Sequence, residues 1–278
     1  MKKRFGVIGD PVSHSLSPVI HHHFLSQFQI DGDYQKIHIK ANEFDQKIYE
    51  LKEQNLDGFN ITVPFKTAIL PFLDELSEEA KNIGAVNTVV NESGKWIGYN
   101  TDGFGFVQMI KNMDINLSNQ KIAIIGAGGS TKSIYYYLIK EQPLLVDIAN
   151  RTVEKAIKLI DRYQSNYSRN QAMSLEELEE NISQYDIVIQ TTSVGMVPKL
   201  NDMPIQLRNL NEGAFVFDII YTPYETKFLK EAKKRGAICC NGLDMLLYQA
   251  AYAFYIWTKR MPNIELAKEQ IMKTIKGA

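Results

Sequence analysis

The sequence has few cysteines, and this absence excludes two classes of protein. Its two cysteines, Cys239 and Cys240, are adjacent. A vicinal pair neither makes an ordinary structural disulfide nor supplies a metal site by itself. We therefore expect no disulfide scaffold and no metal, and a reduced, cytoplasmic compartment fits best.

The sequence also lacks an excess of charge and a long apolar run. Lys and Arg total 31 and Asp and Glu total 32, so the formal net charge of the 278 residues is -1. Without a basic patch, a small molecule is a better candidate partner than nucleic acid or an anionic membrane. Because the apolar run after Arg4 is too short for a signal peptide and none approaches a membrane span of about 18 residues, we expect no membrane association.

What the chain does have is an alternation of short apolar strands with helices. This alternation predicts mostly parallel sheets covered on both faces, in one large domain or two of ordinary size. In the first part of the chain we predict strands at 4–8, 34–39, 57–63 and 84–90 and a further strand within 95–103, and helices from about residue 18, over 43–54, 66–73, 77–82 and 103–112.

Segment 58–66, GFNITVPFK, places a lysine directly after a strand. Phe59 and Ile61 alternate with small or polar residues as in a strand, and Pro64 removes a backbone donor and ends the ladder. Strand ends in open α/β sheets are where ligands bind, so Lys66 is a candidate for proton transfer. The alternative is a solvated lysine at a helix start, and only other polar groups at the same place decide between the two.

Other polar residues follow or interrupt expected strands. Ser15 and Ser17 precede Pro18 at a helix start, where hydroxyls can hold a carboxylate, although Ser17 alone is also an ordinary N-cap. Asn87 lies among apolar residues, where a buried amide needs partners. Asp102 follows another strand, and helix capping is its alternative role.

Three consecutive histidines, 21–23, lie on the first expected helix. Side chains at i, i+1 and i+2 of a helix point in three directions, so they cannot jointly bind a metal. We interpret them as structural, with one of them partly buried.

A second unit begins at residue 121. The expected strand 121–125 runs into the glycine-rich segment 126–130 and then a helix to about residue 140, which is typical of a Rossmann-type dinucleotide turn. Glycines let the chain turn tightly and bring backbone amides against a pyrophosphate. Thr131 occupies the place of the strict third glycine, so helix and strand must pack around a larger side chain.

The next expected strand, 144–149, ends in Asn150, Arg151 and Thr152. An acidic residue here takes the ribose hydroxyls of NAD, whereas an arginine accommodates the 2′-phosphate of NADP. Arg151, supported by Lys155, therefore favours NADP, while Asp147 lies inside the strand, short of its end. The alternative is that residues 150–152 only cap the helix expected over 153–164. Further strands are expected at 185–190, 215–219 and 237–240, and helices at 246–259 and 264–276.

Seven separated segments together resemble one family, the shikimate dehydrogenases. They are GDPVSHSLSP (9–18), GFNITVPFK (58–66), GAVNT (84–88), GYNTDGFG (98–105), GAGGS (126–130), NRT (150–152) and NGLDMLLYQA (241–250). The resemblance implies a two-domain α/β enzyme that reversibly reduces 3-dehydroshikimate to shikimate with NADPH in the aromatic amino-acid (chorismate) pathway. It implies an open, mostly parallel substrate domain of residues 1–101 plus 243–278, to which the C-terminal helices return, and a Rossmann-type NADP-binding domain of residues 102–242.

The resemblance also implies a role for each matching residue. Lys66 and Asp102 would be the acid/base pair at the reacting hydroxyl, with Asp102 also touching substrate. The other substrate-binding residues would be Ser15, Ser17 and Tyr221 at the carboxylate and Thr62, Asn87 and Gln249 at the ring hydroxyls. The cofactor-binding residues would be Glu78, Gly126, Ala127, Gly128, Gly129, Ser130, Asn150, Arg151, Thr152, Lys155, Ile219 and Gly242. Lys155 stands where the family often has arginine, and Ser130 and Thr131 stand where small apolar residues are usual.

Three alternatives stay open at this point. One is a quinate/shikimate dehydrogenase with relaxed substrate use or NAD. Another is a catalytically silent nucleotide-binding regulator, which would not need Lys66 and Asp102 together. A third is an amino-acid-type or folate dehydrogenase, which would not need the set of Ser15, Ser17, Asn87 and Gln249 together. The chain is expected to act as a monomer or a homodimer.

Overall fold

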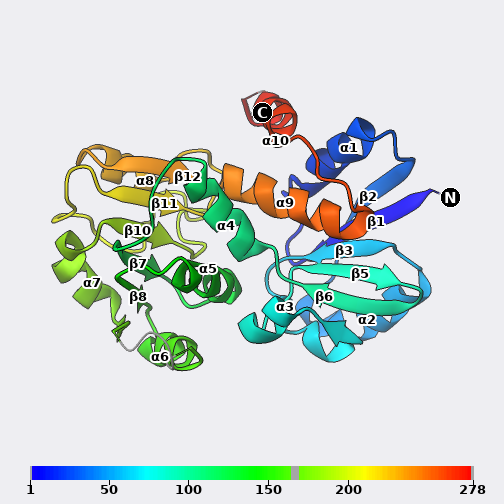
Figure 1. Ribbon diagram of the computed structural model, residues 1–278, viewed down its shortest axis with the longest axis horizontal. Helices are drawn as coiled ribbons and strands as arrows, with labels where there is room; N and C mark the ends of the chain where they lie inside the picture. Colours follow the sequence, from blue (N-terminus) through cyan, green and yellow to red (C-terminus); the bar gives the residue numbers. More distant parts are fainter. Residues whose placement is uncertain (1, 164–168, 277–278) are drawn as a thin grey trace. The chain divides into compact units, whose positions relative to one another are not determined.

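The computed structural model describes residues 2–163 and 169–276, and the chain divides into two compact units, each built on a six-stranded sheet (Figure 1). Unit 1 comprises Met1–Phe106 and Leu246–Ala278, and unit 2 comprises Val107–Met245. The boundaries expected from the sequence, at 101/102 and 242/243, lie a few residues earlier. As a result, Asp102 groups with unit 1. No helix within the described ranges is long and apolar enough to cross a membrane.

The sheet of unit 1 has the strand order β2-β1-β3-β5-β6-β4. β5 runs antiparallel to both of its neighbours, and the other pairs are parallel. A tight turn joins β5 to β6, and in it Ser93 and Gly94 adopt positive φ angles of 55° and 91°. The strands are β1 (Lys3–Gly9), β2 (Gly32–His38), β3 (Gly58–Ile61), β4 (Glu75–Leu76), β5 (Thr88–Glu92) and β6 (Lys95–Tyr99).

The C-terminal helices return to unit 1, as the sequence predicts. Trp257 of α9 donates its indole N–H to the Val89 carbonyl oxygen at 2.9 Å and stacks on Phe5 at 4.7 Å. A Cβ at Gly58 would lie 2.3 Å from the indole nitrogen, so glycine is needed beneath that ring. The helices are α1 (Ser17–Gln27), α2 (Phe44–Glu53), α3 (Glu78–Ile83), α4 (Asp102–Lys111), α9 (Leu243–Thr258) and α10 (Ile264–Lys276), with short 3₁₀ turns η1 (Ala41–Glu43) and η2 (Leu70–Phe72).

The helix predicted at 66–73 is wrong. Residues 63–69 form consecutive turns, and only the 3₁₀ turn η2 follows them. Pro71 explains this result, because proline lacks a backbone donor and disfavours the α conformation of the residue before it. Lys66 therefore lies on a turn segment rather than on a helix.

The sheet of unit 2 is entirely parallel and has the order β12-β11-β10-β7-β8-β9. With β7 taken as strand 1 and the sheet read from β9 to β12, this is the 3-2-1-4-5-6 order of the Rossmann fold. The predicted fold class is therefore confirmed. Two short strands, β4 and β9, and the helices α7 and α8 were not predicted. The elements are β7 (Lys121–Ile125), α5 (Gly129–Lys140), β8 (Leu145–Ala149), α6 (Val153–Asp161), β9 (Ala172–Met173), α7 (Leu175–Asn181), η3 (Ile182–Gln184), β10 (Ile187–Gln190), β11 (Phe215–Asp218), α8 (Lys227–Lys233) and β12 (Ile238–Asn241).

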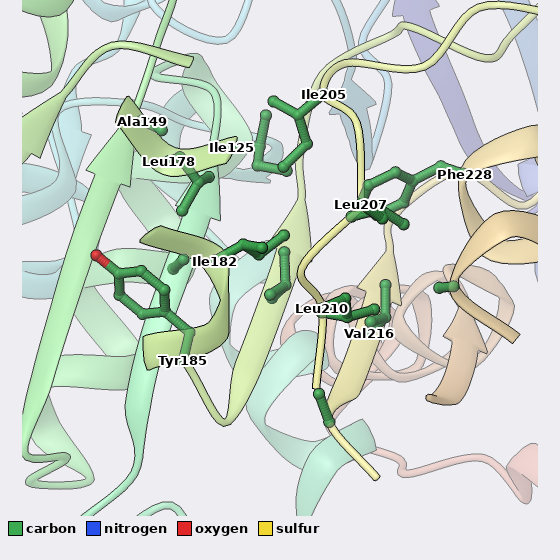
Figure 2. Close-up of a cluster of buried hydrophobic side chains, with 14 of the residues drawn as sticks. Ile125, Ala149, Leu178, Ile182, Tyr185, Ile205, Leu207, Leu210, Val216 and Phe228 are labelled. Carbon is green, nitrogen blue, oxygen red and sulfur yellow. The ribbon is translucent and has the colours of Figure 1, made fainter. Parts of the chain in front are cut away.

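One core of unit 2 covers a face of this sheet (Figure 2). Leu178 of α7, Ile182 of η3 and Phe228 of α8 are fully buried against strand residues such as Val216. The core therefore holds the strands rigidly, and the residues just beyond their carboxyl ends are free to differ in chemistry.

Candidate active site

The residues expected to bind substrate in unit 1 lie along one edge of its sheet. The carboxyl ends of β1 and β3 lie at the same level of the sheet, because Ile8 pairs with Ile61. On the other side of β3, Thr88 at the start of the antiparallel strand β5 pairs with Tyr99 at the end of β6. Asn87 therefore precedes its strand, whereas the other polar residues follow theirs. The segments at this edge carry Ser15 and, at the start of α1, Ser17 after β1, Thr62 and Lys66 after β3, Asn87 before β5, and Asp102 at the start of α4 after β6.

Lys66 and Asp102 form a close ion pair at this edge. Lys66 Nζ lies 2.5 Å from Asp102 Oδ2, and the two side chains are 12% and 7% exposed. The backbone of the turn is held as well, because the Lys66 carbonyl oxygen accepts from Val86 N–H at 2.7 Å. Low exposure strengthens the attraction relative to a surface pair and keeps water from competing for the ammonium group.

Asn87 holds the other oxygen of Asp102. Its Oδ1 accepts from the Thr101 backbone N–H at 2.8 Å and from Thr88 Oγ1 at 3.0 Å. These donors turn the amide so that Nδ2 faces Asp102 Oδ1, to which it donates at 2.7 Å. The carboxylate is thus held from two sides, by a cation on one oxygen and an amide on the other.

Gln249 joins the same cluster from α9. Its Oε1 lies 3.3 Å from Asn87 Nδ2 and 3.4 Å from Thr101 Oγ1, and its Nε2 donates to the Leu246 carbonyl oxygen at 2.9 Å. The structure therefore brings together four of the expected residues, separated by up to 183 positions in the chain (249 minus 66). They are Lys66, Asn87, Asp102 and Gln249.

The sequence reading missed the residues that orient this cluster. Asn60 donates to the Asn87 carbonyl oxygen at 3.1 Å and to Thr88 Oγ1 at 3.0 Å, and it accepts from Tyr34 OH at 2.7 Å. Burial raises the pKa of Tyr34 well above its usual range, and a hydrogen bond with Ser17 offsets part of this rise. The available signal was an Asn at an inward position of an apolar strand, since such an amide needs buried partners.

The loop after β1 is fitted closely to the loop after β3. A Cβ at Gly9 would lie 2.4 Å from Thr62 Cγ2, and Asp10 N–H donates to the Val63 carbonyl oxygen at 3.0 Å. Further along this loop, Ser15 Oγ accepts from Ser17 N–H at 3.2 Å. Thr62 thus lies on the same segment as Lys66, and the two serines lie at the same edge on the segment that follows β1.

The expected cofactor residues of unit 2 also lie along one sheet edge. The paired residues at this edge are Ile125 with Ala149, Ile125 with Gln190, Gln190 with Asp218, and Asp218 with Asn241. The segments that follow these ends carry Gly126 to Ser130, Asn150 to Lys155, Ile219 and Gly242. This edge is where ligands bind in open parallel sheets.

The glycine turn fits a dinucleotide pyrophosphate. Gly126 has a φ of 112°, and a Cβ there would lie 2.7 Å from Thr191 Oγ1, so the turn requires glycine. A Cβ at Gly128 would meet nothing within 4 Å, so the outer side of the turn is open for close approach of a ligand to the backbone. The first N–H groups of α5, which begins at Gly129, add the positive end of a helix.

Arg151 follows β8 on the adjacent strand end and is exposed, as are Thr152 and Lys155. Gly126 N–H donates to the Ala149 carbonyl oxygen at 2.8 Å, which joins this strand end directly to the glycine turn. The acidic alternative, Asp147, is engaged inside the unit, where it accepts from Tyr185 OH at 2.8 Å and from Gln171 N–H at 2.6 Å. The end of β8 therefore carries two exposed cationic side chains, Arg151 and Lys155, whereas the Asp147 carboxylate is engaged inside the unit.

Ile219 and Gly242 are packed against each other. A Cβ at Gly242 would lie 2.0 Å from the Ile219 carbonyl oxygen, and Gly242 N–H donates to the Ile220 carbonyl oxygen at 3.1 Å. Asp218 anchors this segment by accepting from Ile220 N–H at 3.0 Å and Thr226 Oγ1 at 2.7 Å. Burial raises the pKa of Asp218 to about 6, and the two hydrogen bonds, which lower the pKa, offset part of this rise.

Two expected residues lie in a different unit from the other residues of their expected site. Glu78 is exposed at the start of α3 in unit 1, and Tyr221 lies in unit 2, where burial raises its pKa. The expected role of Glu78 in cofactor binding and that of Tyr221 in substrate binding stay predictions.

The fold and these two groups of residues define a dehydrogenase-type α/β protein with a Rossmann unit and a second unit that carries a buried lysine and carboxylate. Family comparisons agree along the chain: the shikimate dehydrogenase substrate binding domain matches residues 7–89, shikimate / quinate 5-dehydrogenase matches 108–223, and the shikimate 5′-dehydrogenase C-terminal domain matches 242–272. The chain belongs to the shikimate dehydrogenase family.

Individual relatives are similar over the whole chain. A shikimate dehydrogenase (NADP(+)) of Bacillus cereus is 45% identical over 278 residues, covering 100% of both chains. The Thermus thermophilus shikimate 5-dehydrogenase, solved in complex with NADP(H) and shikimate, is 32% identical with a TM-score of 0.86, covering 98% of this chain and 99% of that one. The Corynebacterium glutamicum quinate dehydrogenase, solved in complex with NAD, is 27% identical with a TM-score of 0.87, covering 98% and 99%.

Proposed function

We propose that this chain is an NADP-dependent shikimate dehydrogenase, an oxidoreductase that reversibly reduces 3-dehydroshikimate to shikimate in the aromatic amino-acid pathway. The full-length identity of 45% to a curated NADP-dependent relative is the observation that carries this proposal. The buried ion pair in unit 1 supports it, because a carbonyl reductase needs a proton donor beside the reacting oxygen.

Lys66 is the proposed proton donor in reduction and acceptor in oxidation. When bound, NADPH supplies the hydride that the carbonyl carbon requires. The carbonyl oxygen then gains charge, and an ammonium within hydrogen-bond reach can neutralise it by proton transfer. Asp102 keeps the ammonium in place, and Asn87 keeps Asp102 in place. A pH–rate profile therefore reports the coupled pair rather than either residue.

The remaining site residues support binding. Thr62, Asn87 and Gln249 are proposed to hold the ring hydroxyls, while Ser15, Ser17 and Tyr221 hold the carboxylate. The hydroxyl and amide groups of the unit 1 residues lie at the Lys66 edge, where donors and acceptors for a small polyol are needed.

In unit 2, the turn from Gly126 to Ser130 is proposed to hold the pyrophosphate. Asn150, Arg151, Thr152 and Lys155 are proposed to hold the 2′-phosphate, and Ile219 and Gly242 to contact the nicotinamide, with Glu78 of unit 1 as a further cofactor contact. The exposed cations after β8 support this assignment.

The test is oxidation of NADPH, followed by its absorbance, with 3-dehydroshikimate as substrate. We expect turnover that depends on both compounds. Absence of turnover with a correctly folded chain would refute the proposed function.

A second candidate is a quinate dehydrogenase or an NAD-dependent enzyme. The similarity to a quinate dehydrogenase solved with NAD favours including it, as does Lys155, which lacks the planar fork of an arginine. Assays of shikimate and quinate, each with NADP and NAD, separate the candidates. The monomeric or dimeric state and the cytoplasmic location stay predictions.

A further inference from the structure

The glycine turn of unit 2 contains a chain of hydroxyl groups that the roles above do not use. Thr131, on the first turn of α5, is 0% exposed; its Oγ1 accepts from Gly128 N–H at 3.0 Å and lies 2.8 Å from Thr191 Oγ1. Thr191 Oγ1 donates to the Ile125 carbonyl oxygen at 2.7 Å. These two hydroxyls therefore connect the end of β7, the middle of the turn and the end of β10.

The direction of this chain follows from the number of hydrogens. A carbonyl oxygen only accepts and a hydroxyl has one hydrogen to give, so Thr191 donates to Ile125 and must accept from Thr131. Thr131 then gives its hydrogen to Thr191 and accepts from Gly128 N–H. Because Thr131 is fully buried, a water molecule cannot readily replace either of its partners.

The same contacts constrain the shape of the turn. Thr191 Oγ1 lies only 2.7 Å from the position that a Cβ of Gly126 would take. The backbone N–H of Thr191 also donates to the Ile125 carbonyl oxygen, at 2.9 Å. Gly128 N–H is directed inward to Thr131, so the N–H groups offered to a phosphate begin at Gly129, where α5 starts. The hydroxyl of Thr131 thus decides which backbone donors face outward.

We propose that Thr131, acting through Gly128 and Thr191, is a positioning residue that holds the turn 126–130 in its dinucleotide-binding shape before NADP(H) binds. The inference rests on the proposed function, because it takes the bound group to be NADP(H). An apolar residue at position 131 leaves Gly128 N–H without its partner and separates the turn from β10. The turn must then become ordered during binding, which weakens the affinity.

The test measures the dissociation constant of NADPH for the full-length chain by nicotinamide fluorescence, well below the Tm of each variant. Thr131→Val keeps the branched shape and removes the hydroxyl, and we expect affinity to fall by about three- to tenfold, the equivalent of one net hydrogen bond. Thr131→Ser restores the hydroxyl and should bind nearly as the unsubstituted chain does. Ile134→Val, at a fully buried position on the same helix, is the matched control that lowers Tm without changing the affinity.

The opposing outcomes are distinct. Unchanged affinity in Thr131→Val together with a lower Tm would mean that the hydroxyl has only a structural role. Tighter binding would mean that the Gly128 N–H serves the phosphate better once it is released from Thr131. Either result overturns the inference. If Thr131→Val fails to fold, Thr191→Val tests the other end of the chain of hydroxyls, and unchanged affinity there overturns the inference as well. If the unsubstituted chain does not bind NADPH, the proposed function fails too, whereas in the other cases it stands.

Discussion

The buried imidazole of His21 should make the stability of unit 1 depend on pH. His21 is 1% exposed and stacks on Tyr34 at 4.4 Å, and neither of its ring nitrogens has a hydrogen-bond partner among the described residues. Burial, reinforced by the neighbouring His22 and opposed by the nearby Asn60 amide, lowers the pKa of His21 to about 3. An unfolded histidine has a pKa of about 6.5.

The sign and size of the effect follow from these two values. Between pH 6.5 and pH 3 the unfolded chain binds a proton at this site and the folded chain does not, so stability is complete above about pH 6.5 and falls as the pH is lowered. The slope is about 1.4 kcal/mol per pH unit, which amounts to about 2 kcal/mol between pH 7.5 and pH 5. Residual structure in the unfolded chain makes this an upper value.

Urea unfolding followed by tryptophan fluorescence can measure this loss. Both tryptophans, Trp96 and Trp257, lie in unit 1, and Trp257 is 5.1 Å from the His21 ring, so the signal reports the right unit. His21→Phe should lose about 2 kcal/mol less than the unsubstituted chain between pH 7.5 and pH 5. Comparing the pH dependence within each variant cancels any change in packing that the substitution introduces.

The control is His14→Gln, because His14 is exposed and its replacement should leave the pH dependence as it was. His21→Leu provides a second, smaller replacement should phenylalanine overfill the site. Equal losses of stability in His21→Phe and the unsubstituted chain over this pH range would show that His21 does not stay neutral in the folded protein.

Three further predictions concern activity. Lys66→Ala should lower kcat by about 100-fold or more with little change in the KM for substrate, as expected for loss of general acid–base catalysis. Nearly normal turnover would contradict the assignment. The control is Lys3→Ala, which removes an exposed ion pair with Asp57. Lys155→Arg should raise the preference for NADP over NAD by about threefold or more through planar contact with the phosphate, measured as the ratio of kcat/KM values; an unchanged ratio would place Lys155 away from the phosphate. Gly242→Ala must displace the Ile219 carbonyl oxygen, 2.0 Å from the new Cβ, so the KM for NADPH should rise, and an unaltered KM would argue against a cofactor contact there.

Sequence reasoning predicted the fold well because the local patterns agree with the final structure. Apolar runs such as 121–125, followed by a glycine turn and a helix, specify the parallel strands of unit 2. The helix predicted at 66–73 failed because Pro71 overrides the local pattern. The two-residue strands β4 and β9 were missed because so short a segment carries no periodicity.

The individual residues of the unit 1 cluster were predicted more readily than their contacts. Lys66 and Asp102 each follow a strand, so their presence at one edge could be expected from a parallel sheet. The reversal of β5, which places Asn87 at the same edge from the other end of its strand, was not predicted, and neither were the roles of Asn60 and Thr101. Contacts of this kind depend on side-chain directions that a linear pattern does not specify.

The direction of the Asn87 amide follows from its neighbours and fixes how the Lys66–Asp102 pair is held. Its oxygen must face the Thr101 N–H and the Thr88 hydroxyl, so its nitrogen must face Asp102. The amide therefore donates to Asp102 Oδ1, while the Lys66 ammonium contacts Oδ2. We infer that Asp102 positions the ammonium while Lys66 carries the proton. Asn87→Asp would place a second carboxylate beside the first, and the repulsion between them would disturb the pair more than removal of the amide would.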